Sequence, residues 1–159
     1  MSKHEKLDGP ASPPVFRHAD GPGGWQNVPV LTYKEEGDAP FKAVTRQVLF
    51  HDEKLKSEFR YFEVGSGGHS TLERHEHVHA VMIHRGRGQC LVGQEVREIA
   101  VGDLVFIPSL TWHQFRANRG EPLGFLCLVN VERDKPQLPD ADTAKELAMS
   151  PAVAKFFAT

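Results

Sequence analysis

The feature that most constrains the fold is a series of short β-rich segments between residue 41 and about residue 132. Glycine-containing turns, such as Gly67-Gly68 and Gly86-Arg87-Gly88, separate the segments roughly every 8–12 residues, and no helical pattern intervenes. This spacing predicts an all-β fold, a closed or two-sheet antiparallel barrel of about eight strands. The expected strands cover residues 43–50, 59–64, 79–84, 89–92, 96–99, 104–107, 111–116 and 123–131.

The segment before the barrel has a different composition. Residues 1–40 hold six prolines and five glycines and few apolar runs. This composition predicts an irregular N-terminal arm, with one edge strand over residues 28–33. The chain of 159 residues is long enough for one domain with its own core. We therefore divide it into an arm (1–40), a barrel (41–132) and a C-terminal tail (133–159).

The C-terminal tail contains a helix signal after its prolines. Asp140 or Asp142 is a candidate N-cap for a short helix over residues 143–149. Residues 151–157 are expected to form a second turn or to continue that helix. A short helix at this end has no chemistry of its own.

Composition excludes several function classes. The net charge is −2, so the basic excess of a nucleic-acid-binding protein is missing. No apolar run approaches the roughly 20 residues of a membrane span, and the N-terminus lacks the apolar core of a signal peptide. The two cysteines, Cys90 and Cys127, are too few for a disulfide framework. We expect reduced packing residues and a cytoplasmic protein.

Histidine is the compositional anomaly, with nine residues in all and five of them between His69 and His84. The sequence of residues 71–80 is Thr-Leu-Glu-Arg-His-Glu-His-Val-His-Ala. In an extended strand, alternate residues share a face, so one face would carry a carboxylate and three imidazoles. These groups are ligands for transition metals, although a solvated strand face also alternates in this way. The donors on this face are Glu73, His75, His77 and His79.

A second segment, residues 102–113, reads Gly-Asp-Leu-Val-Phe-Ile-Pro-Ser-Leu-Thr-Trp-His. Together, the two segments resemble the paired motifs of the cupin superfamily, G-x5-H-x-H-x3-E-x6-G and G-x5-P-x-G-x2-H-x3-N. The resemblance covers residues 67–118 and is to small single-domain proteins with a cupin 2 conserved barrel. It implies a jelly-roll (double-stranded β-helix) barrel. Leu110 stands where the second motif usually has glycine, and Asn118 lies one place late.

The resemblance leaves two ligand registers. In the preferred register, Gly67 and Gly86 take the glycine positions and every spacing fits, with glutamate replacing one histidine and histidine replacing the acidic ligand. Its metal ligands are Glu73, His75, His79 and His113. The rival register pairs His75 with His77 and puts Val81, which cannot bind metal, at the third position. Its ligand set is His75, His77, His79 and His113.

The expected cofactor is one divalent transition metal ion, and Mn, Fe, Ni, Zn and Cu all accept this donor set. Such an ion would keep open positions and residual positive charge, which favours an anionic or chelating small molecule. Acid–base help is expected from Tyr61, Glu76 or His77.

Cupins of this size are similar in fold but include dioxygenases, lyases, isomerases and sensors, so the fold does not choose the chemistry. We expect a metal-dependent oxidoreductase of the dioxygenase kind that acts on a small organic molecule. The alternatives are a lyase or isomerase that uses the metal as a Lewis acid, and a non-catalytic binding module for metal or a small ligand. The resemblance also implies a homodimer.

Overall fold

The fold is known from a computed structural model that describes residues 15–19, 24–32 and 42–159. Most of the expected N-terminal arm therefore lies outside the described residues. The edge strand expected over residues 28–33 corresponds to β1 (Leu31–Thr32), which pairs with the strand that follows. Residue 33 is not among the described residues.

Eight further strands follow β1, and their positions match the β-rich segments of the sequence. A long hairpin comes first, and shorter strands follow it. The strands are β2 (Lys42–Asp52), β3 (Ser57–His69), β4 (His79–Arg85), β5 (Arg87–Val92), β6 (Glu95–Ala100), β7 (Leu104–Ile107), β8 (His113–Ala117) and β9 (Leu123–Asn130).

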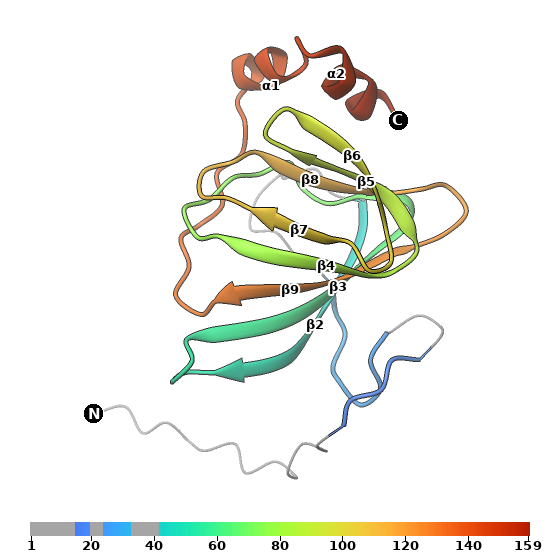
Figure 1. Cartoon of the computed structure of the whole chain (residues 1–159), viewed down its shortest axis with the longest axis vertical. Helices are drawn as coiled ribbons and strands as arrows, with labels where there is room; N and C mark the ends of the chain where they lie inside the picture. Colours follow the sequence, from blue (N-terminus) through green and yellow to red (C-terminus); the bar gives the residue numbers. More distant parts are fainter. Residues whose placement is uncertain (1–14, 20–23, 33–41) are drawn as a thin grey trace.

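All strand pairs are antiparallel, and the order across the curled sheet is β6-β5-β8-β3-β9-β4-β7, with β2 added to β3. The consecutive strands β3 and β4 do not pair, because β9 lies between them. The sheet curls into a half-barrel (Figure 1). The predicted all-β cupin fold is therefore confirmed. The two motif segments lie in one sheet because β7 pairs with β4, and β8 pairs with β3 and β5.

Alternation along the strands separates the interior from the surface. On β4, Val81 and Ile83 are buried, whereas Met82 between them is exposed. The same alternation on β9 buries Phe125, Cys127 and Val129. These side chains belong to a single apolar cluster inside the half-barrel. The cluster excludes water from the interior of the half-barrel.

The tail forms two short helices, α1 (Ala141–Leu147) and α2 (Pro151–Ala158). The carboxylate of Asp140 caps α1 by accepting a hydrogen bond from the Thr143 backbone N–H at 2.8 Å. Pro151 lacks a backbone N–H and occupies the first turn of α2. Both helices lie beyond β5 and β6 (Figure 1). Among the described residues, no helix has the length and apolarity needed to cross a bilayer.

Candidate metal centre

A cavity of about 220 Å³ opens at one end of the half-barrel. Apolar side chains from β2, β3, β8 and β9 form part of its wall: Val44, Phe62, Phe115 and Phe125. Four imidazoles line the same cavity: His75, His77, His79 and His113. This volume is below that of a typical pocket for a drug-sized ligand, so the cavity has room only for a small molecule.

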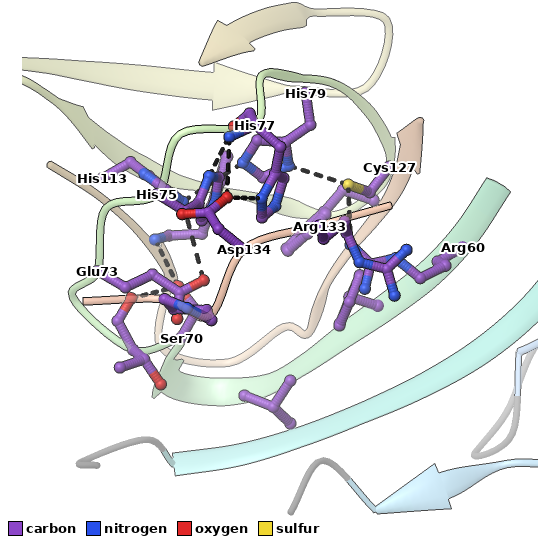
Figure 2. Close-up of a pocket in the computed structure, with 16 residues that line it drawn as sticks. Arg60, Ser70, Glu73, His75, His77, His79, His113, Cys127, Arg133 and Asp134 are labelled. Atoms are coloured by element: carbon purple, nitrogen blue, oxygen red, sulfur yellow. Dashed lines mark hydrogen bonds and ion pairs between the residues drawn. The ribbon is translucent and has the colours of Figure 1, made fainter. Parts of the chain in front are cut away.

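Three of these histidines, His75, His79 and His113, form a group that we call the histidine triad. Each contributes one ligand atom, and these atoms all lie within 4.8 Å of one another. Figure 2 shows the rings converging from different segments of the chain. The triad could hold a metal ion, and its three members are the ones that both sequence registers share.

The first residues of two strands and a loop held by backbone hydrogen bonds position the triad. His79 begins β4 and His113 begins β8. His75 lies in the segment between β3 and β4, where a pair of backbone hydrogen bonds joins Glu73 to His113 at 3.2 and 3.0 Å. The His75 carbonyl accepts a further hydrogen bond from the Leu110 backbone N–H at 2.7 Å. Donors that are distant in sequence are thus brought to one point.

Leu110 has a left-handed backbone, with φ of 54°. This is the position where the second cupin motif usually has glycine, the residue that adopts positive φ without steric cost. The chain therefore keeps the turn that glycine would make. The hydrogen bond from the Leu110 backbone N–H to the His75 carbonyl helps to hold this turn.

The Nδ1 atom of each triad histidine is engaged on the side away from the common centre. His75 Nδ1 donates to the His77 carbonyl at 2.7 Å, and His113 Nδ1 donates to the Thr111 carbonyl at 2.9 Å. His79 Nδ1 lies 3.0 Å from the Cys127 sulfur. Because carbonyls only accept, the lone pairs of His75 and His113 remain on Nε2, as a metal ligand requires.

Burial keeps the triad neutral. Together with the positive charge that neighbouring imidazoles would carry, it lowers the pKa of His79 to about 2 and that of His113 to about 4. Burial also lowers the pKa of His75. A neutral imidazole has the lone pair that binds a cation, so the donor chemistry of the triad fits a divalent transition metal.

The two residues that compete for the fourth ligand position have different surroundings. The Glu73 carboxylate lies 3.9 Å from His113 Nε2. The His77 ring stacks on His75 with centroids 3.6 Å apart, and its Nδ1 lies 2.7 Å from the Asp134 carboxylate. The identity of the fourth ligand stays a prediction.

Only one of the three acid–base candidates lines the cavity. His77 lines it, whereas Tyr61 and Glu76 do not. Tyr61 is buried on the other face of β3, where its hydroxyl donates to Glu63 at 2.9 Å. Glu76 is exposed and lines a separate surface hollow.

Other cavity residues went unnoticed in the sequence. Arg133 and Asp134 follow β9, where no motif marks them, and Cys127 reads there as a packing residue. The Asp134 carboxylate accepts hydrogen bonds from the Glu76 and His77 backbone N–H groups at 2.7 and 3.0 Å. Asp134 therefore holds the loop that carries His77.

The jelly-roll half-barrel, with a histidine triad contributed by two motif segments, defines a cupin. The sequence profile of the cupin domain family matches residues 60–129. Together with the relatives described next, this match shows that the chain belongs to the cupin family.

The chain is 57% identical over 141 residues to 1-methylthio-D-xylulose 5-phosphate methylsulfurylase of Rhodospirillum rubrum, covering 89% of this chain and 90% of that protein. Among solved structures, a cupin 2 conserved barrel domain protein from Rhodopseudomonas palustris is 59% identical, with a TM-score of 0.81, and the match covers 89% of this chain and 97% of the other. A cupin 2 domain-containing protein from Halorhodospira halophila is 40% identical, with a TM-score of 0.68 and coverages of 80% and 93%.

These relatives correct the expected activity. The sequence predicts a dioxygenase-like oxidoreductase, but the methylsulfurylase is named for a methylthio sugar phosphate. The prediction was wrong because cupins with similar donors perform different reactions.

Proposed function

We propose that this protein is an enzyme that acts on the methylthio group of 1-methylthio-D-xylulose 5-phosphate or a closely similar methylthio ketose phosphate. The observation that carries the proposal is the 57% identity to the methylsulfurylase over nine-tenths of both chains. Such a compound is small and anionic, and a cavity of about 220 Å³ beside a histidine triad suits it. If the protein binds this compound without converting it, the activity test below would show unchanged substrate.

The triad, with Glu73 as fourth ligand, would hold one divalent transition metal ion. When bound, the ion supplies Lewis acidity to a carbonyl next to the carbon–sulfur bond. We prefer Glu73 to His77 because its carboxylate lies 3.9 Å from His113 Nε2 and because every spacing of the first cupin motif fits this register.

The protein's own side chains have separate roles in this proposal. Phe62, Phe115 and Phe125 give the cavity an apolar wall that excludes water and contacts the methylthio group. His77 is oriented by Asp134 through the 2.7 Å contact at Nδ1, so its Nε2 can hold or move a proton. Asp134 is a positioning residue in this arrangement.

We also propose a homodimer and a cytoplasmic location. The outer faces of β4, β7 and β9 expose four large apolar side chains, which we call the outer stripe: Met82, Leu104, Phe106 and Leu128. A second copy of the chain would cover this surface. Both cysteines are free and buried, which is consistent with a reducing compartment.

The test combines metal content with turnover. Protein purified without a metal-affinity tag is incubated with 1-methylthio-D-xylulose 5-phosphate. The incubation is done with and without an added thiol, which could accept the methylthio group, and ¹H NMR follows the S-methyl signal. We expect about one metal per chain and loss of the substrate S-methyl signal. His113→Ala should lose both the metal and the activity. The matched control is His84→Ala, because His84 lies on β4 and outside the cavity.

Two further variants test the fourth ligand. Glu73→Gln is expected to lower the bound metal, while His77→Gln keeps the metal and slows turnover. The opposite pattern would assign the site to the rival register. An unchanged substrate in the presence of fully metal-loaded protein would refute the proposed activity.

A further inference from the structure

Two arginines line the cavity on the side away from Glu73. Arg60 comes from β3 and Arg133 follows β9. Figure 2 shows both guanidinium groups side by side, with Cys127 between Arg60 and His79. The charged side of the cavity is therefore built from segments that neither cupin motif includes.

The two arginines share a single carboxylate. Arg60 Nε lies 3.6 Å from Glu58 Oε1, and Arg133 Nη1 lies 3.5 Å from the same oxygen. Among the residues that the structure describes, Glu58 is the only acidic partner of either side chain. The pair therefore keeps an excess positive charge. Burial lowers the pKa of Arg133, and the charges of Arg60 and Arg46 lower it as well.

Arg60 also has an unmet hydrogen bond. The residue is only 9% exposed, and its Nε is buried without a hydrogen-bond partner. Its Nη2 contacts the Cys127 sulfur at 3.7 Å, a weak acceptor. The guanidinium carbon lies 5.0 Å from the centroid of the Phe62 ring, which helps to hold the group in place. Burying a guanidinium with an unmet hydrogen bond costs free energy, unless a bound ligand supplies the missing acceptor.

The Cys127 sulfur links the arginines to the triad. It lies 3.7 Å from Arg60 Nη2 and 3.0 Å from His79 Nδ1, so the guanidinium and the triad are one side chain apart. A ligand held at the arginines would extend across the same cavity to the triad. The negative groups on the cavity wall are placed elsewhere: Glu73 lies beside His113, and Asp134 bonds to His77.

We propose that Arg60 and Arg133 form the subsite that binds the phosphate group of the substrate and thereby place the reacting end of the sugar at the histidine triad. The chemistry is that of guanidinium groups, whose planar donors match the oxygens of a phosphate and bind them in pairs. The assignment of the phosphate to a sugar substrate rests on the proposed function. The anion subsite itself rests on the two arginines, their shared counter-ion and the unmet hydrogen bond of Arg60 Nε. Arg133 Nη1 also donates to the Asn130 carbonyl at 3.1 Å.

The first experiment uses inorganic phosphate as the probe, titrated into the metal-loaded protein and followed by isothermal calorimetry. We expect Arg133→Gln to weaken phosphate binding at least tenfold and Arg133→Lys to have an intermediate effect, because lysine keeps the charge but not the paired donors. The matched control is Arg97→Gln, since Arg97 is exposed on β6 and outside the cavity. Arg60→Gln is a second test, and circular dichroism checks that this buried variant folds.

The second experiment measures turnover of the methylthio ketose phosphate and of the same sugar without phosphate. For Arg133→Gln we expect KM of the phosphorylated substrate to rise at least tenfold with a smaller change in kcat, and kinetics of the unphosphorylated sugar to stay as in the wild type. A purely structural role for Arg133 would impair both sugars equally and overturn the subsite.

The failures of the two proposals can be told apart. Phosphate binding that depends on Arg133, in a protein that never consumes the methylthio ketose phosphate, would refute the proposed activity and support the anion subsite. Normal turnover with an unchanged KM in Arg133→Gln would overturn the subsite alone. Phosphate binding that survives Arg133→Gln but disappears after metal removal by a chelator would place the anion on the metal and overturn the subsite.

Discussion

At the scale of single residues, His113 shows how burial prepares an imidazole for a metal. The side chain is buried at the start of β8, and its Nδ1 donates to the Thr111 carbonyl at 2.9 Å. Burial lowers its pKa to about 4, although that hydrogen bond alone would raise it. The same environment that leaves Nε2 ready for a cation makes protonation of the folded chain costly.

This cost predicts a pH dependence in the metal-free protein. An unfolded histidine has a pKa of about 6.5, whereas that of folded His113 is about 4. Between these values the unfolded chain binds more protons, so the free energy of unfolding falls as the pH falls from 6.5 towards 4. The contribution of His113 is at most about 1.4 kcal/mol per pH unit. Urea denaturation of the metal-free protein at several pH values would measure it.

The control for this prediction is His113→Asn, which removes the titrating group from the same place. Its free energy of unfolding should depend less steeply on pH than that of the wild type over this range. Identical slopes for the two proteins would contradict the assignment to His113.

At the scale of elements, the C-terminal helices cover a part of the sheet remote from the cavity. Phe156 and Val153 of α2 and Leu147 of α1 are buried against Leu91 of β5. Arg116 of β8 places its guanidinium carbon 4.9 Å from the centroid of the Phe156 ring. None of these residues lines the cavity, so the helices stabilise the barrel without contributing a group to the site.

We expect Phe156→Ala to lower the free energy of unfolding by about 3–5 kcal/mol, because it removes a fully buried aromatic ring and leaves a cavity. Chemical denaturation measures the change. Phe157→Ala is the matched control, since Phe157 is only partly buried, and it should cost clearly less. The metal content of both variants should stay at the wild-type level. Equal losses of stability in the two variants would argue against α2 docking through Phe156.

At the scale of the whole molecule, the outer stripe leaves a large apolar area in water. Met82, Leu104, Phe106 and Leu128 are 43–63% exposed. They lie together because β4 pairs with both β7 and β9, with Met82 opposite Leu104 and Ala80 opposite both Phe106 and Leu128. Such a surface is typical of an interface between subunits.

We therefore expect Phe106→Glu to convert a dimer into a monomer, because it places a charge in the centre of the apolar contact. Light scattering coupled to size-exclusion chromatography gives the mass of each species. Met149→Glu changes an exposed apolar side chain between α1 and α2, outside the stripe, and should leave the dimer intact. A monomeric wild-type protein would refute the proposed dimer.

Local sequence patterns predicted much of the fold of this molecule. The β-rich runs and glycine turns predicted the strands between residues 43 and 131 closely, because alternation and turn chemistry depend on neighbouring residues. The resemblance to the two cupin motifs also implied that His75, His79 and His113 would lie together, as they do. A reading of the sequence by itself could therefore determine the fold class and three donors of the candidate metal centre.

Tertiary structure alone decided what faces the cavity. Strand alternation separates Arg60 from Tyr61, but only the pairing of β3 with β9 places Arg60 inside and Tyr61 on the other face. Likewise, Arg133 and Asp134 reach the cavity because β9 runs between β3 and β4 and ends beside the histidine loop. Contacts of this kind join residues that lie far apart in the chain, so no local pattern records them.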